Sequence, residues 1–303
     1  GSLIACTILS GRILQPVAAL PGQLIHWGYC KSAIQGLDHI WQLPDDHHSQ
    51  EPVLLQSIQG TYIFKEVAYS YNTLPALKVP QLQIKHGEKI GVLGPIGSGK
   101  TTLLRVLSGM FKPQEGRVLL DGIDLAHIDK PVLAQNIGYV QQDGRLFSGS
   151  LRDNLILGQV DPGDEAILAV ARKTGLMQSV ITPHPQGLQR TIHEGGTGLS
   201  GGQRQLVNLT RTLLLKPSIW LLDEPTASMD RNTEAHVIAV LKEWLKGRTL
   251  LMSTHRPQLL EWADVIGVID AGQCVAMGPK QEMIDKLSRG IDVNTATANG
   301  ARA

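Results

Sequence analysis

Net charge and aromatic residues are both scarce in this sequence. The 303 residues carry a formal net charge of +1, and only 4% of them are Phe, Trp or Tyr. A chain this close to neutral has no general basic field that would attract the phosphate backbone of a nucleic acid. The composition therefore argues against a nucleic-acid-binding protein.

Cysteine is scarce as well, with Cys6, Cys30 and Cys274 as the only three. They are scattered and odd in number, so they make neither a metal-ligand pattern nor a disulfide framework. This usage is typical of a protein in a reducing compartment. We interpret all three as small buried hydrophobic residues.

Permanent charge is nearly absent from residues 2–30, where Arg12 is the only Lys, Arg, Asp or Glu. The stretch exceeds the ~20 apolar residues that a membrane-spanning helix needs. Trp27, Tyr29 and then Lys31 follow the pattern of an aromatic belt and a cytoplasmic cation. The stretch lacks a basic start and a small-residue cleavage site, which argues against a signal peptide. We predict a transmembrane helix, and a buried or interfacial helix is the alternative.

Pro16 and Pro21 lie within this stretch and would kink a helix, which membrane helices tolerate when their neighbours satisfy the freed backbone groups. Apolar residues at helical spacing continue to Trp41, which predicts an amphipathic stalk that ends at Pro44. Two Asp and two His open the polar run that follows: Asp45, Asp46, His47 and His48. We interpret this run as a solvated linker, and a metal site is the alternative.

The most specific pattern is a glycine-rich loop that fits G-x-x-x-x-G-K-[ST]. Its residues are Gly94, Pro95, Ile96, Gly97, Ser98, Gly99, Lys100, Thr101 and Thr102. Residues 89–93 predict a buried parallel strand before it, and residues 103–107 continue a helix after it. The glycines let the backbone approach phosphate oxygens, and the helix N-terminus adds unpaired N–H groups. We predict a nucleotide site with Lys100 at the β- and γ-phosphates and Thr101 on Mg²⁺, with an ordinary glycine turn as the alternative.

Two further strands end in polar residues. Residues 218–224 predict a strand that is covered on both faces and ends in Asp223 and Glu224. Asp223 can hold Mg²⁺ through water, and Glu224 can orient or deprotonate a water molecule. Residues 249–254 predict a second buried strand followed by His255, at the strand end where ligands collect in such sheets. The alternatives are a capping acid pair and a structural histidine.

A second glycine-lined helix start lies at residues 200–203. Ser200 and Gln203 have the spacing of a capping box around Gly201 and Gly202, and the predicted helix runs to about Lys216. Its N-terminus is again suited to phosphate. The remaining predicted elements are strands at 62–64, 67–71, 116–122 and 137–143, a loosely helical region at 161–188, and a hairpin at 265–270 and 274–276.

From about residue 60 to residue 287 the chain resembles the nucleotide-binding domain of ABC transporters, and the sequence Leu-Ser-Gly-Gly-Gln at 199–203 carries most of the resemblance. The resemblance implies that Tyr71 stacks on adenine and that Ser200, Gly201, Gly202 and Gln203 also bind the nucleotide. It implies a catalytic set of Glu224 as the base, His255 on the γ-phosphate, Lys100 and Gln142, and Mg²⁺ ligands Thr101, Gln142 and Asp223. Gln142 would also signal to the membrane domain. Ser228, Met229 and Asp230 match the D-loop, and Glu194 matches an acidic residue that exporters use for coupling.

The N-terminal part resembles the last transmembrane helix of ABC exporters and its cytoplasmic extension. Segments 3–5, 9–12, 194–196 and 254–256 are most similar to bacterial type I secretion exporters for RTX toxins and adhesins. Three residues depart from the family pattern. Met229 replaces a small D-loop residue, and Asn208 and Thr210 replace alanines of the signature helix. These departures put helix packing and turnover rate in question, and leave the reaction type unchanged.

We therefore expect an α/β fold: a P-loop NTPase parallel sheet with an antiparallel β subdomain and an inserted helical subdomain, preceded by a transmembrane helix segment. The expected domains are the last transmembrane helix and extension of a truncated membrane domain (1–44), a linker (45–58), the nucleotide-binding domain (59–287, with the helical subdomain at about 146–210) and a disordered tail (288–303).

The resemblance implies Mg²⁺-dependent ATP hydrolysis that powers export of a protein. Because the loop and the signature of one ATP site come from opposite subunits in this family, we expect a head-to-tail homodimer around two ATP molecules. The expected partners are the membrane domain of the full exporter, a periplasmic adaptor, an outer-membrane channel and a protein cargo, with no nucleic acid. The expected location is the bacterial inner membrane, with the nucleotide-binding domain in the cytoplasm. The alternatives are an exporter of a peptide, lipid or drug, a soluble ABC ATPase that acts on nucleic acid, and a P-loop kinase.

Overall fold

The computed structural model describes residues 2–43, 53–55 and 57–288. The chain divides into two units, residues 1–48 and 49–303, and each is described by itself. Most of the predicted linker, with its run of Asp and His, and residues 289–303 of the predicted tail lie outside the described residues.

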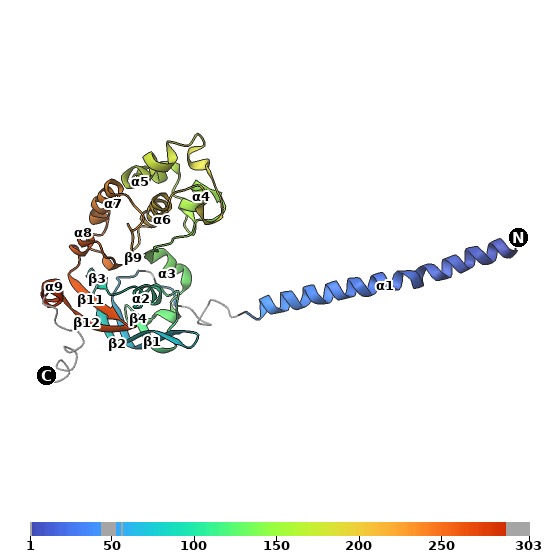
Figure 1. Cartoon of the computed structure of the whole chain (residues 1–303), viewed down its shortest axis with the longest axis horizontal. Helices are drawn as coiled ribbons and strands as arrows, with labels where there is room; N and C mark the ends of the chain where they lie inside the picture. Colours follow the sequence, from blue (N-terminus) through green and yellow to red (C-terminus); the bar gives the residue numbers. More distant parts are fainter. Residues whose placement is uncertain (1, 44–52, 56, 289–303) are drawn as a thin grey trace. The chain divides into compact units, whose positions relative to one another are not determined.

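The described part of the first unit consists of one helix, α1 (Ser2–Trp41), which contains Pro16 and Pro21 (Figure 1). Within the described residues it is the one helix that is long and apolar enough to cross a membrane. None of its residues is buried, because a lone helix has no partner in its unit to pack against. Cys6 and Cys30 lie on this helix and are exposed, and Cys274 is half-buried, so the prediction of three buried cysteines is wrong.

The described part of the second unit contains a ten-stranded sheet in the order β5-β4-β1-β2-β12-β11-β3-β10-β9-β6. The parallel part consists of β6 (Ile137–Val140), β9 (Ile219–Asp223), β10 (Thr249–Ser253), β3 (Lys89–Leu93) and β11 (Val265–Asp270). The antiparallel pairings involve β1 (Tyr62–Tyr71), β2 (Leu74–Ile84), β4 (Glu115–Leu120), β5 (Ile123–Asp124) and β12 (Gln273–Pro279). The predicted α/β fold, with parallel and antiparallel parts, is confirmed.

Both faces of the parallel part are buried. Along β9, Ile219 and Leu221 belong to the hydrophobic core that includes α2 (Lys100–Leu107). Trp220 and Leu222, on the opposite face, belong to the core that includes α6 (Gly201–Leu215). Burial on both faces explains why the sequence of this strand is a continuous apolar run without alternation.

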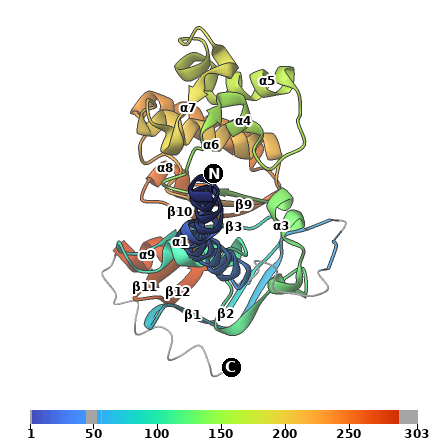
Figure 2. The same cartoon turned by 90° about the vertical axis from the view of Figure 1, so that its right-hand side faces the viewer.

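Helices gather on the α6 side of the second unit. Figures 1 and 2 show α4 (Leu151–Ile156), α5 (Asp164–Thr174), α6 and α7 (Arg231–Trp244) grouped there. The region predicted as loosely helical is α5 followed by a π-helical turn (Met177–Ile181) and a 3₁₀ turn (Gly187–Gln189). The other elements are α3 (Lys130–Asn136), α8 (Pro257–Leu260), α9 (Lys280–Ser288), a 3₁₀ turn at Leu125–His127, a 3₁₀ turn at Glu194–Gly196, and a two-stranded sheet of β7 (Gly149–Ser150) and β8 (Thr191–Ile192).

Several elements differ from the sequence expectation. The predicted strands 62–64 and 67–71 form one strand, β1, in which the register shifts between Lys65 and Ala68 and Glu66 has a left-handed φ of 50°. Strand β2 was not predicted, since Pro75 and Pro80 argue against a strand until its pairing with β1 is known. Helix α7 was not predicted either, although Asp230 is a suitable N-cap and accepts from the N–H groups of two residues that follow it.

Candidate functional site

The glycine-rich loop connects β3 to α2, as predicted. Gly94, Gly97 and Gly99 have φ values of +155°, +79° and +106°, which L-residues rarely adopt. A Cβ atom at Gly94 would overlap the carbonyl oxygen of Ile269, and one at Gly99 would lie 2.7 Å from the carbonyl oxygen of Ala76. Two of these glycines are thus required both by the backbone conformation and by the close approach of neighbouring strands.

Lys100 and Ser98 are polar residues of this loop. The Lys100 ammonium group donates to the carbonyl oxygens of Gly94 and Pro95, at 2.7 and 2.8 Å. The Ser98 hydroxyl is buried and has no hydrogen-bond partner within the described residues. Ile96, at the tip of the loop, is 98% exposed. An ammonium group and the free N–H groups of a helix N-terminus fit an anion with several oxygen atoms.

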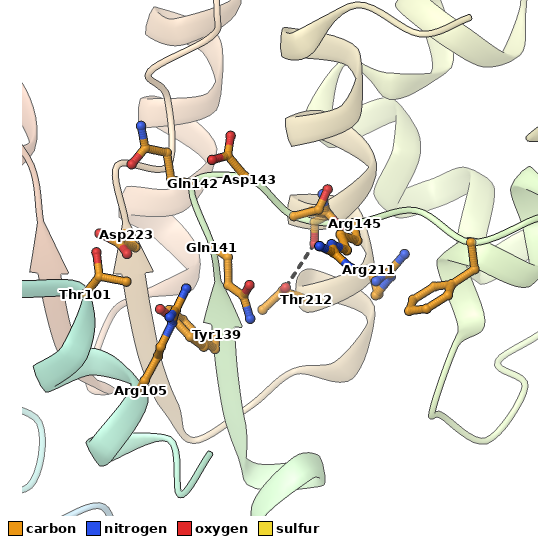
Figure 3. Close-up of a pocket in the computed structure, with 13 residues that line it drawn as sticks. Thr101, Arg105, Tyr139, Gln141, Gln142, Asp143, Arg145, Arg211, Thr212 and Asp223 are labelled. Carbon is orange, nitrogen blue, oxygen red and sulfur yellow. Dashed lines mark hydrogen bonds between the residues drawn. The ribbon is translucent and has the colours of Figure 1, made fainter. Parts of the chain in front are cut away.

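Asp223 lies at the same end of the sheet as this loop. It pairs with Ser253 of β10, which in turn pairs with Val92 of β3. Asp223 is 3% exposed, and burial raises the pKa of its carboxyl group, while the hydroxyls of Thr101 and Ser253 act in the opposite direction. Figure 3 shows Asp223 beside Thr101 of α2. Carboxylate and hydroxyl oxygens are ligands that suit Mg²⁺.

Glu224 leaves the end of β9 in a left-handed conformation with φ 47°, which is strained for a residue with a Cβ atom. Its backbone N–H donates to the carbonyl oxygen of Ser253 at 2.9 Å, so the position is fixed by the neighbouring strand. Its Oε1 lies 3.6 Å from Nε2 of His255. Partial burial raises the pKa of the Glu224 carboxyl group, and the nearby His255 opposes this shift. A carboxylate with a raised pKa is better suited to accept a proton from water.

A cavity of about 540 Å³ opens next to these groups (Figure 3). Gln142, which follows β6, lines it together with Thr101 and Asp223. All three residues predicted to bind the metal therefore line one cavity. The cavity is also lined by three arginines: Arg105, Arg145 and Arg211. Burial lowers the pKa of Arg211 to about 10.

Tyr71 lies at the end of β1 next to α2. Its hydroxyl is 3.3 Å from Oγ1 of Thr102, the last residue of the loop motif. Its ring packs edge-on against Tyr69 and Phe111, with centroid distances of 5.3 and 5.7 Å. Tyr71 is 40% exposed, so an aromatic ring that its neighbours fix in place has an accessible surface beside α2.

The capping box predicted at the start of α6 is confirmed. Ser200 Oγ accepts from the Gln203 N–H at 3.2 Å, and Gln203 Oε1 accepts from the Ser200 N–H at 2.9 Å. A Cβ atom at Gly202 would lie 2.9 Å from the carbonyl oxygen of Ser228, and Gly201 also packs on Ser228. Within the described residues no hydrogen bond or ion pair joins residues 200–203 to the loop 94–102.

Gln205, which is buried one turn along α6, is a residue of the site that the sequence patterns did not indicate. Its Nε2 lies 3.5 Å from the carbonyl oxygen of Gln142 and 3.4 Å from that of Glu224. Its Oε1 accepts from the Ser228 N–H at 3.0 Å. One side chain thus connects α6 to two loops, the one after β6 and the one after β9. The available signal was a glutamine on the buried side of an amphipathic helix.

Three further residues were assigned by resemblance. Met229 is 8% exposed and belongs to the α6-side core, which accommodates its larger side chain. Asp230 caps α7. Glu194 accepts a long hydrogen bond of 3.4 Å from the Ser148 N–H through Oε2.

The loop, the strand-end carboxylates and the glycine-lined start of α6 together define a P-loop nucleotide-binding domain. Residues 77–227 match the ABC transporter family. The chain belongs to this family through its ATP-binding domain.

Several known proteins resemble most of the chain. YfiC of Bacillus subtilis, an uncharacterized ABC transporter ATP-binding protein, is 32% identical over 94% of this chain and 47% of its own length. The leukotoxin translocation ATP-binding protein LktB of Mannheimia glucosida is 33% identical, and the cyclolysin secretion/processing ATP-binding protein CyaB of Bordetella pertussis is 32% identical; for each, 94% of this chain and 40% of the relative are covered. The chain therefore spans less than half the length of these relatives.

Among solved structures, a bacterial Atm1-family ABC exporter with ATP bound is similar with a TM-score of 0.72 and 29% identity. The match covers 78% of this chain and 42% of the exporter chain. The matched part of this chain thus shares its fold with an ABC exporter whose structure was solved with ATP bound.

Proposed function

We propose that the second unit is the Mg²⁺-dependent ATPase domain of an ABC exporter. The observation that carries the proposal is the convergence of Lys100, Asp223 and Glu224 at one end of β3, β9 and β10. In phosphoryl transfer the protein contributes mainly positioning and charge stabilisation. A lysine, a buried carboxylate and a carboxylate with a raised pKa are the groups that this chemistry needs.

Each residue has one role in this proposal. Lys100 and the loop bind the β- and γ-phosphates, Tyr71 stacks on adenine, and His255 holds the γ-phosphate. Glu224 orients the attacking water and accepts its proton. Thr101, Asp223 and Gln142 hold Mg²⁺, which neutralises phosphate charge when bound. A hydroxyl, one carboxylate and an amide oxygen suit Mg²⁺, because this ion keeps several waters and uses few carboxylates.

The complete ATP site in this proposal is formed by two chains. Ser200 is exposed at the start of α6, and its only hydrogen bonds in the described structure are those of the capping box and of the helix. The glycine-lined helix start is therefore available to a phosphate from outside the chain. A head-to-tail homodimer places it over the loop of the partner subunit, twice, around two ATP molecules.

The exporter part of the proposal rests on the relatives and on α1. LktB and CyaB are named for toxin translocation and secretion, which favours a protein cargo. Helix α1 is apolar enough to span a membrane, which favours a bacterial inner-membrane location with the ATPase domain in the cytoplasm. The membrane domain of the full exporter, a periplasmic adaptor and an outer-membrane channel are the corresponding partners. Another cargo is the second candidate, because the similar solved structure is an Atm1-family exporter.

A complementation experiment tests the cargo class. The gene is deleted in its host, and the deletion strain receives either the wild-type gene or the Glu224→Gln variant. We expect a protein to disappear from the culture medium and to return only with the wild-type gene. An unchanged set of secreted proteins, together with a changed small-molecule or lipid content, would favour the second candidate.

A further inference from the structure

Asn208 makes an unusual contact from the middle of α6. It is 7% exposed, and its Nδ2 group donates to the carbonyl oxygen of Gly144 at 2.9 Å and to that of Arg204 at 3.1 Å. Gly144 lies in the loop after β6, and Arg204 lies one turn earlier on α6. Both protons of the amide therefore have an acceptor, and the side chain connects the loop to the helix.

Gly144 and Asn208 are matched in shape. A Cβ atom at Gly144 would overlap Nδ2 and Cγ of Asn208. The glycine is required here by the close approach of the amide, since its φ does not lie in the left-handed region. An alanine at either position would break the contact, because it would either displace the amide or remove it.

The contact lies between two parts of the proposed ATPase. The helix that carries Asn208 begins at Ser200, which the proposed function assigns to the ATP on the partner subunit. Gly144 follows two residues after Gln142, which the proposed function assigns to the Mg²⁺ of its own subunit. Gln205 also reaches the Gln142 carbonyl oxygen, but at 3.5 Å this bond is longer than that of Asn208.

We propose that Asn208 is a positioning residue that ties loop 141–145 to the signature helix, and that this tie transmits the occupancy of one ATP site to Gln142 of the other. The first half of the proposal stands on the contacts alone. The second half rests on the proposed function.

Thr210 offers a matched control on the same helix. It is buried like Asn208, and its Oγ1 lies 2.8 Å from Oγ1 of Thr174 on α5, away from loop 141–145. Thr210→Ala therefore removes a buried polar contact of α6 without touching the loop.

Hydrogen exchange of the nucleotide-free 303-residue chain in detergent tests the tie. We expect the amides of Phe147 and Gly195, which donate to Oδ1 of Asn154 and to the carbonyl oxygen of Leu146 next to the loop, to exchange about threefold to tenfold faster in Asn208→Ala, the factor for one net hydrogen bond. Gly144→Ala should show the same increase, and the double variant should exchange no faster than the faster single variant. Thr210→Ala should leave this loop unchanged. Unchanged exchange in Asn208→Ala, an equal increase in Thr210→Ala, or additive effects in the double variant would overturn the tie.

Steady-state ATP hydrolysis tests the transmission. We expect the wild-type chain to show a Hill coefficient for ATP above one, Asn208→Ala to lower it toward one and to raise the half-saturating ATP concentration, and Thr210→Ala to retain it. A wild-type coefficient of one, or an equal coefficient in Asn208→Ala, would overturn the transmission. If the wild-type chain hydrolysed no ATP, the proposed function and the transmission would both fail, while the exchange measurement would still decide the tie.

Discussion

Replacement of Glu224 by Gln tests the proposed reaction most directly. The substitution keeps the size of the side chain and the backbone contacts, in which the Glu224 N–H donates to Ser253 and its carbonyl oxygen faces Gln205. It removes the carboxylate that is 17% exposed and lies 3.6 Å from His255. General base catalysis contributes about 10²–10⁴-fold, so we expect turnover to fall by that factor, or about 2.7–5.5 kcal/mol in activation free energy. Affinity for ATP should stay within a few-fold.

The dependence on pH gives the same test an independent readout. Because burial raises the pKa of the Glu224 carboxyl group, the group retains its proton to a higher pH than an exposed glutamate. The base is active only when it is deprotonated, so the wild-type rate should rise with pH through this raised pKa. In Glu224→Gln this acid limb should be absent from the residual activity.

Phosphate release and ATP binding, measured on the same preparations, decide the outcome. Size-exclusion chromatography should also show the variant accumulating as an ATP-bound dimer. Turnover in Glu224→Gln within tenfold of the wild type, with an unchanged acid limb, would refute the assignment of Glu224 as the base.

Three further predictions concern the shared site, the loop and the first unit. A mixture of Lys100→Ala and Ser200→Arg chains should regain part of the ATPase activity that each variant lacks alone, since a mixed dimer has one intact site. Full turnover by dilute wild-type monomers would contradict the shared site. Gly94→Ala should lower the free energy of unfolding by about 2–5 kcal/mol, because its Cβ atom would overlap a β11 carbonyl oxygen. Gly97→Ala is the control: nothing lies close to its Cβ position, so it should lower the free energy of unfolding by only about 1–2 kcal/mol. Equal melting temperatures of the two variants would contradict the close approach at Gly94. A chain that starts at Val53 should sediment as a soluble species and bind ATP, while the 303-residue chain should require detergent; a detergent-free, monodisperse full chain would contradict the membrane assignment of α1.

Much of the fold could be predicted because its signals are local in the sequence. The glycine pattern of residues 94–102 predicted both the turn and the elements beside it, and β3 and α2 follow as expected. Ser200 and Gln203 predicted the start of α6, since a capping box involves two residues three positions apart. The apolar run of β9 predicted burial on both faces. Strand β2 was not predicted, because Pro75 and Pro80 argue against a strand in the sequence, and its pairing with β1 is a contact that only the fold shows.

The site itself was decided by contacts between distant parts of the chain. The sequence alone determined that a loop, two carboxylates and a signature helix are present, because each is a pattern within a few residues. Only the tertiary structure placed Gln142 in one cavity with Thr101 and Asp223. It alone turned Glu224 into a left-handed conformation against β10. It also showed what Asn208 contacts, because the Asn208 amide donates to the carbonyl oxygen of Gly144, 64 residues away in the sequence. A buried polar group is stable only where a partner satisfies it, and that partner is chosen by the packing of the whole domain.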